Sequence, residues 1–173
     1  SAGPVIDKEA YERILKTIEE SKKENKLLFQ GTVPANGYFV APTIFTNVKP
    51  DSKLAQEEIF GPVLAIIRAK DIEHAIQIAN GTEYALTGGL FSRSPDNIEK
   101  VRQEFECGNL YINRGITGAM VDRHPFGGFK MSGIGSKTGG PDYLKQFMEP
   151  RAVTENTMRR GFAPNEENDG KGV

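Results

Sequence analysis

Apolar positions along the chain follow a helical period in some segments and form short continuous runs in others. Over residues 8–23 they repeat every three to four positions, which predicts an amphipathic helix, and Asp7 is a suitable N-cap residue. The next segment, "KLLFQ" at 26–30, is predicted to be a short strand. The first part of the chain is therefore predicted to be a helix followed by a strand.

Two apolar, β-rich stretches follow. Residues 37–48, "GYFVAPTIFTNV", are interrupted by Pro42, which predicts either two short strands or an edge strand. Residues 61–69, "GPVLAIIRA", are almost continuously apolar. Such a run is typical of a strand that is covered on both faces.

The second half of the chain alternates helices and strands. Asp71 and Gly81 mark the start and the end of a short helix, and residues 86–92 predict a strand. Residues 94–105 predict a second helix, and 108–113, "GNLYIN", a buried strand. This alternation indicates an α/β fold with a largely parallel sheet. Because loops after the carboxyl ends of such strands carry the sites, the segment after "GNLYIN" is a candidate binding loop.

Composition narrows the classes of function. The 173 residues are 38% hydrophobic and 26% charged, with a net charge of -1, which fits a soluble globular protein and argues against nucleic acid or an anionic membrane as the main partner. The single cysteine excludes an internal disulfide and a multi-cysteine zinc site, and it favours a reducing compartment. We find no signal peptide or membrane span in the sequence.

The candidate binding loop, residues 114–133, reads "RGITGAMVDRHPFGGFKMSG". Glycine permits close approach of the backbone to a ligand, and Thr117 to Ala119, "TGA", is able to turn consecutive N–H groups toward one anion. A substrate carboxylate is a reasonable guest, and the alternative is a glycine-rich connector without a ligand. The sequence contains neither a phosphate-binding P-loop nor a GxGxxG motif that opens a helix here.

Residues 56–66, "QEEIFGPVLAI", are a second candidate site. A carboxylate before a buried strand is able to accept hydrogen bonds from a ribose diol, and Phe60 is able to pack on a planar ring. The alternative is a pair of solvated glutamates beside a core phenylalanine.

The remaining reactive side chains do not form a catalytic set. Cys107 is flanked by Glu104 and Glu106 and leads into a buried strand, which favours an inert structural thiol. His74 and His124 share no metal-ligand spacing, and we expect His124 to shape the loop.

Four motifs carry a resemblance to a known family. These are "EEIFGPV", "NGTEYALTGGLFS", "CGNLYIN" and "PFGGFKMSGIGSKTG", in this order. Together they resemble the C-terminal part of the NAD(P)-dependent aldehyde dehydrogenases, and the resemblance runs over nearly the whole chain. It implies an aldehyde-dehydrogenase-like catalytic-domain fragment with a largely parallel sheet.

The loop and the segment "GGPDYLKQFMEPRAVTENT" resemble one group within that family, the 1-pyrroline-5-carboxylate dehydrogenases. These oxidise L-glutamate γ-semialdehyde to L-glutamate in proline degradation. By match, the backbone N–H groups of Gly118 and Ala119 bind the substrate α-carboxylate, and Phe126 flanks its aliphatic part.

The same resemblance implies a cofactor and a partner. Glu58 matches the residue that holds the nicotinamide ribose of NAD, and Phe60 matches the aromatic side chain beside the nicotinamide. We expect residues 1–149 to be the later part of the catalytic domain. Residues 150–157 are then a strand that joins a second copy in a homo-oligomer, at least a dimer, and 158–173 are a polar tail.

The family nucleophile, a cysteine in a different motif, is not matched by Cys107, so the resemblance implies no catalytic residue in this chain. We therefore expect a fragment that is inactive alone and belongs to a bacterial cytoplasmic enzyme, with a mitochondrial matrix as the alternative location. Two other interpretations remain: the end of a bifunctional protein that also carries a proline dehydrogenase, and a non-catalytic module that dimerises or binds a carboxylate.

Overall fold

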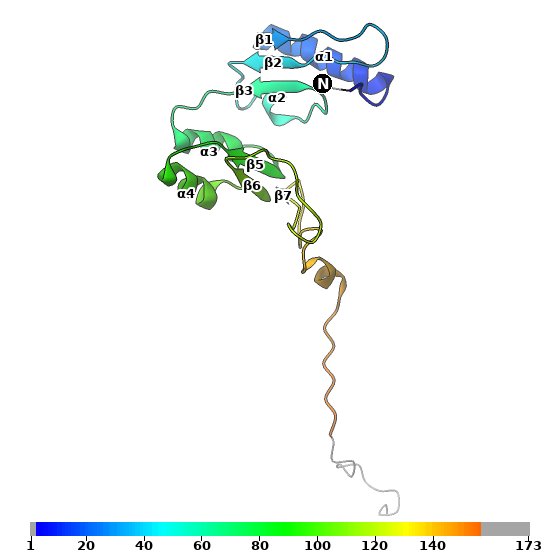
Figure 1. The fold of residues 1–173 in the computed structure, drawn as a ribbon, viewed down its shortest axis with the longest axis vertical. Helices are drawn as coiled ribbons and strands as arrows, with labels where there is room; N and C mark the ends of the chain where they lie inside the picture. Colours follow the sequence, from blue (N-terminus) through cyan, green and yellow to red (C-terminus); the bar gives the residue numbers. More distant parts are fainter. Residues whose placement is uncertain (1–2, 157–173) are drawn as a thin grey trace, which may run out of the picture.

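The computed structural model describes residues 3–156 (Figure 1). None of the helices in this range has the length and apolar character needed to span a membrane. The elements, in chain order, are α1 (Lys8–Glu24), β1 (Lys26–Gln30), β2 (Thr43–Thr46), α2 (Lys53–Gln56), β3 (Val63–Ile66), α3 (Ile72–Asn80), β4 (Tyr84–Ala85), β5 (Thr87–Leu90), α4 (Pro95–Glu104), β6 (Asn109–Ile112), β7 (Phe129–Lys130) and the 3-10 helix η1 (Tyr143–Phe147).

The first layer consists of α1 and the sheet β1-β2-β3, in which β1 is antiparallel to β2 and β2 is parallel to β3. As predicted, α1 begins at its cap, because Oδ1 of Asp7 accepts a hydrogen bond from the Ala10 N–H at 2.7 Å. The apolar face of α1 packs Ile14 and Ile18 against Phe45 of β2. These fully buried side chains form the centre of the core.

Two expectations for this layer need correction. Residues 37–48 contribute one strand rather than two, because Gly37 has a left-handed backbone and strand β2 starts only after Pro42. This strand is central and not at an edge, since β2 lies between β1 and β3. The strand at 63–66 is not covered on both faces. Val63 and Ala65 pack on the core, but 55% of Leu64 is exposed, because α1 covers one face of this sheet only.

The second layer holds α3, α4 and the parallel pair β5-β6, which α4 connects (Figure 1). The start predicted at Asp71 is confirmed, since its Oδ1 accepts from the His74 N–H at 2.7 Å. Helix α4 is capped by Ser94, whose Oγ accepts from the Asn97 N–H at 3.3 Å. Strand β6 is half-buried rather than buried.

The short strands β4 and β7 pair antiparallel and bring distant parts of the chain together. The α/β class is confirmed. Among the described strands, two pairings are parallel and two antiparallel, so the sheets are mixed rather than largely parallel. The parallel pairs occur where a helix connects the two strands, as such crossovers require.

The chain after η1 leaves the body as an extended segment (orange in Figure 1). Residues 151–156 are exposed and form no strand within the described structure. Pairing of segment 150–157 with a second copy therefore stays a prediction. Residue 157 and the expected tail 158–173 lie outside the described residues.

Candidate functional site

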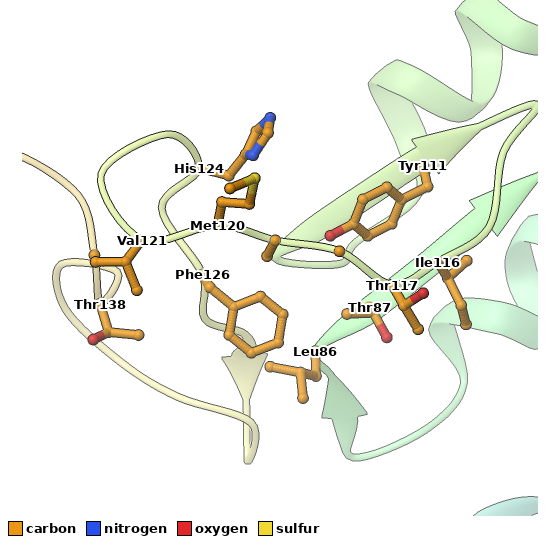
Figure 2. Close-up of a pocket in the computed structure, with 13 residues that line it drawn as sticks. Leu86, Thr87, Tyr111, Ile116, Thr117, Met120, Val121, His124, Phe126 and Thr138 are labelled. Carbon is orange, nitrogen blue, oxygen red and sulfur yellow. The ribbon is translucent and has the colours of Figure 1, made fainter.

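A cavity of about 540 Å³ lies between the candidate binding loop and strands β5 and β6 (Figure 2). The loop leaves the carboxyl end of β6, as predicted, and then folds back toward the strands, so that Ile116 packs against Gly89. Most of the lining is apolar, and it contains no lysine, arginine, aspartate or glutamate: Leu86, Thr87, Tyr111, Ile116, Thr117, Gly118, Ala119, Met120, Val121, His124, Phe126, Thr138 and Gly139.

Two side chains hold the start of the loop. Asn113 has a left-handed backbone (φ 55°), and its amide group accepts from the Ser92 N–H and donates to the Ser92 carbonyl, both at 2.9 Å. The guanidinium of Arg114 lies 5.3 Å from the centre of the Tyr111 ring and donates to the Thr117 carbonyl at 3.4 Å. The backbone that enters the cavity wall is therefore fixed by polar contacts.

The far side of the loop is held by backbone pairing. The Phe126 N–H donates to the Thr138 carbonyl at 2.9 Å, and the Asp122 N–H donates to the Gly139 carbonyl at 3.1 Å. Since the chain from 122 to 139 closes on itself, Phe126 and Thr138 meet in one wall of the cavity.

Gly118, Ala119 and Phe126, the predicted substrate-binding residues, all line this one cavity. Gly118 has φ +98°, a conformation that glycine adopts readily. Within residues 3–156, no acceptor is found for the backbone N–H of Gly118 or of Ala119. The cavity thus combines available N–H donors with apolar walls, which suits a ligand with an anionic end and an aliphatic body.

Glu58 lies in a neighbouring cavity of about 320 Å³, and Leu86 lines both cavities. The Glu58 carboxylate is exposed and makes no hydrogen bond or ion pair to any described residue. Phe60 has a left-handed backbone (φ 55°) and is 79% exposed, but it lines neither cavity. An exposed carboxylate and an exposed aromatic ring are groups that fit a ribose diol and a planar ring.

Cys107 is buried, with 8% of its surface exposed. Burial raises the pKa of this thiol, and a hydrogen bond with the Gly88 backbone lowers the pKa by less. A thiol that stays protonated is a poor nucleophile, so the structure supports the interpretation of Cys107 as an inert core residue.

The two histidines occur in different elements and make different contacts. Nδ1 of His74 accepts from the Lys70 N–H at 3.2 Å at the start of α3. The backbone N–H of His124 donates to the Met120 carbonyl at 3.0 Å, in a turn of the loop, and its imidazole points away from Phe126 (Figure 2). No group of three or more metal-ligating side chains occurs in the described part of the chain.

Sequence analysis missed the role of strand β6 in building the site. Asn109, Tyr111 and Asn113 alternate along "GNLYIN", and the structure uses all of them at the loop. The spacing of two residues places Asn109 and Tyr111 on one face of β6, which is the signal that was available in the sequence, whereas Asn113 follows the strand with a left-handed backbone.

Known proteins resemble this chain over most of its length. A model of the aldehyde dehydrogenase family matches residues 1–153. The chain is 54% identical over 154 residues to a protein of Geobacillus sp. (strain WCH70) named 1-pyrroline-5-carboxylate dehydrogenase. That match covers 88% of this chain and 30% of the relative, so the chain spans about a third of the length of the relatives it matches.

Two solved structures are similar over most of the chain. Proline utilization A from Bdellovibrio bacteriovorus, inactivated by N-propargylglycine, is 73% identical, with a TM-score of 0.88 over 95% of this chain and 17% of that protein. The 1-pyrroline-5-carboxylate dehydrogenase from Thermus with bound NAD is 52% identical, with a TM-score of 0.81 over 85% of this chain and 29% of that protein.

Proposed function

Because the chain belongs to the aldehyde dehydrogenase family, we propose that it is part of an NAD-dependent enzyme that oxidises L-glutamate γ-semialdehyde to L-glutamate. The observation that carries this proposal is the cavity in which unpaired N–H groups of Gly118 and Ala119 stand beside apolar walls. Relatives named 1-pyrroline-5-carboxylate dehydrogenase at about half identity support the choice of substrate.

The loop supplies the substrate anchor. The N–H groups of Gly118 and Ala119 donate to the α-carboxylate, and each hydrogen bond to a charged group contributes about 1.5–3 kcal/mol. Phe126 and Tyr111 enclose the aliphatic chain, so the aldehyde end is directed out of the cavity. An uncharged aldehyde of the same length lacks the anchored group and binds more weakly.

Two exposed groups would supply the cofactor contacts. The Glu58 carboxylate, which lines the neighbouring cavity, would accept hydrogen bonds from the nicotinamide ribose, and the Phe60 ring, which lies outside that cavity's lining, would pack beside the nicotinamide. NAD, when bound there, would supply the hydride acceptor that oxidation of an aldehyde requires. Because Leu86 lines both cavities, substrate and cofactor bind side by side, an arrangement that contributes up to about 7–11 kcal/mol in the best-aligned reactions.

The nucleophile belongs to another part of the protein. Cys107 is buried and its thiol is kept protonated, so this chain positions the reactants while the remaining two thirds of the enzyme provide the attacking group. A second copy that pairs with segment 150–157 completes the proposed assembly.

A second candidate is a bifunctional protein that also oxidises proline. The observation in its favour is the 73% identity to proline utilization A, which exceeds the identity to the Thermus dehydrogenase. The site in this chain serves the same aldehyde step in both cases. Two measurements distinguish the bifunctional protein from the single dehydrogenase. These are the intact mass of the native protein and its ability to reduce an electron-acceptor dye with proline as the electron donor.

The test of the proposed function is NADH formation by the full-length native protein. Glutamate semialdehyde is compared with an uncharged aldehyde of similar length. We expect kcat/KM to be at least about a hundredfold higher for the semialdehyde, the effect of roughly two charge-assisted hydrogen bonds. Equal rates would remove the carboxylate anchor, and no NADH from either aldehyde would favour the non-catalytic module.

A further inference from the structure

Three asparagines in the second layer bind backbone groups of other segments through their side-chain amides. Each accepts from one backbone N–H and donates to one backbone carbonyl. Asn80 joins the carbonyl of Glu104 at 2.8 Å to the N–H of Glu106 at 2.9 Å, and Asn113 holds Ser92 in the same way. Asn109 holds the Pro125 carbonyl at 2.9 Å and the Gly127 N–H at 3.2 Å.

The asparagine at 109 differs from the other two in what lies between its partners. The residue between Pro125 and Gly127 is Phe126, which lines the substrate cavity. The side chain of Asn109 therefore grips the backbone on both sides of that ring. Its polar contacts leave the aromatic side chain free to face the cavity, where Figure 2 shows it opposite Tyr111.

Next to these hydrogen bonds of Asn109, the backbones of Gly108 and Gly127 also approach each other closely. A Cβ atom at Gly108 would overlap the Gly127 carbonyl oxygen, so the loop packs directly on the chain that enters β6. Asn109 and Tyr111 are two residues apart on β6 and project from the same face of the strand. One strand thus supplies one aromatic wall of the cavity and the side chain that holds the opposite wall.

We infer that Asn109 is a positioning residue, which fixes the separation of Phe126 from Tyr111 and thereby how closely the cavity packs on each methylene group of a carboxylate-bearing aldehyde. The inference rests on the proposed function. Asn109 contacts no reacting atom, and it acts through Phe126. Loss of its grip lets the loop segment 125–127 move away from β6, which widens the cavity and weakens discrimination by length.

The test compares Asn109→Ala with Asn80→Ala in the full-length protein. Both substitutions remove two hydrogen bonds between a side-chain amide and the backbone, but only those of Asn109 lie next to the cavity. Asn109→Asp is a milder variant that keeps an acceptor for the Gly127 N–H and loses the donor to Pro125. Each variant is assayed with the semialdehyde and with an aldehyde acid one carbon shorter, and thermal unfolding is measured alongside.

For Asn109→Ala we expect KM for the semialdehyde to rise about three- to tenfold, with kcat within about twofold, as loss of one or two neutral hydrogen bonds predicts. The preference over the shorter aldehyde should fall by a similar factor. Asn109→Asp should lie between this variant and wild type. Asn80→Ala should lower the unfolding temperature without changing KM or the length preference.

Equal kinetic changes in both alanine variants, or an unchanged KM in Asn109→Ala, would overturn the inference while leaving the proposed function intact. Failure of the wild type to oxidise the semialdehyde would instead overturn the proposed function. In that case the rate of amide hydrogen exchange at Gly127 still tests whether Asn109 holds the loop. Faster exchange in Asn109→Ala than in Asn80→Ala supports it, and equal exchange contradicts it.

Discussion

The first layer and the candidate binding loop are held together by different forces. In the first layer, α1 buries Ile14 and Ile18 against Phe45, and these side chains are at most 1% exposed. Residues 114–140 instead rest on asparagine amides, backbone pairing and close glycine contacts, and several apolar side chains of the loop remain exposed. One region is a packed core, and the other is a polar scaffold around a cavity.

This difference predicts that stability depends mainly on the first layer and that the proposed function depends mainly on the loop. Burial of large apolar side chains contributes several kcal/mol each, whereas a neutral hydrogen bond contributes about 0.5–1.5 kcal/mol net. Changes in the first layer should therefore alter the free energy of unfolding and leave KM nearly constant. Changes in the loop should do the reverse. Each prediction below tests one side of this division in the full-length protein.

The largest effect is expected for Phe45→Ala. The ring is fully buried at the centre of the first layer, and its removal leaves a cavity. The free energy of unfolding should fall by about 3–5 kcal/mol, as measured by denaturant titration. KM for the semialdehyde, measured at a temperature where the variant is folded, should stay within twofold of wild type. A large rise in KM would show that the two regions are not separate.

The next largest effect is expected for Gly108→Ala. The added methyl group would overlap the Gly127 carbonyl oxygen, and backbone atoms on both sides must move. A displacement of about 1 Å near a bound substrate reduces rate roughly a hundredfold, so kcat/KM should fall by about that factor. The control is Gly115→Ala in the same loop, because a Cβ atom there meets nothing within 4 Å.

A smaller effect is expected for Cys107→Ala. Removal of one buried sulfur atom should lower the free energy of unfolding by about 1 kcal/mol. NADH formation should be unchanged, because the proposed function places the nucleophile in another part of the protein. Loss of activity at neutral pH, in a folded variant, would contradict the role given to this residue.

The same residue gives the wild type a pH dependence. Since burial raises the pKa of Cys107 in the folded state, its contribution to stability is complete below the ordinary thiol pKa of 9.0. The contribution is lost as the pH rises through the folded-state pKa. The free energy of unfolding should therefore fall more steeply above about pH 9 in the wild type than in Cys107→Ala.

The sequence predicted the regular elements of both layers well. The N-caps of α1, α3 and α4 are Asp7, Asp71 and Ser94, and local capping and periodicity determine such helix starts. It did not predict that Leu64 is exposed, because the continuity of an apolar run does not reveal what covers each face. The short strands β4 and β7 were missed for a related reason, since they exist only through their long-range pairing.

The residues that line the candidate cavity were predicted in part, whereas their binding role stays a prediction. The loop and the glycines at its centre were recognisable from composition, and Gly118, Ala119 and Phe126 do meet in one cavity. The grip of Asn109 on Pro125 and Gly127 was not predictable, because it joins residues 16 and 18 positions apart. Such contacts depend on how a long loop returns to the sheet, which periodicity does not encode.

The most direct test of the division between core and loop is a comparison of Gly118→Ala with Gly115→Ala. Gly118 has φ +98°, which alanine adopts only with strain, whereas Gly115 has an ordinary backbone and open space. For each variant, kcat/KM is measured with glutamate semialdehyde and with an uncharged aldehyde of similar length, and the free energy of unfolding is measured in parallel.

We predict that Gly118→Ala lowers kcat/KM at least about tenfold for the semialdehyde and by less than twofold for the uncharged aldehyde, because only the first uses the N–H donors. Gly115→Ala should match the wild type with both. Equal losses for the two aldehydes in Gly118→Ala, or a fall in stability as large as that of Phe45→Ala, would contradict a loop that binds the carboxylate without carrying the fold.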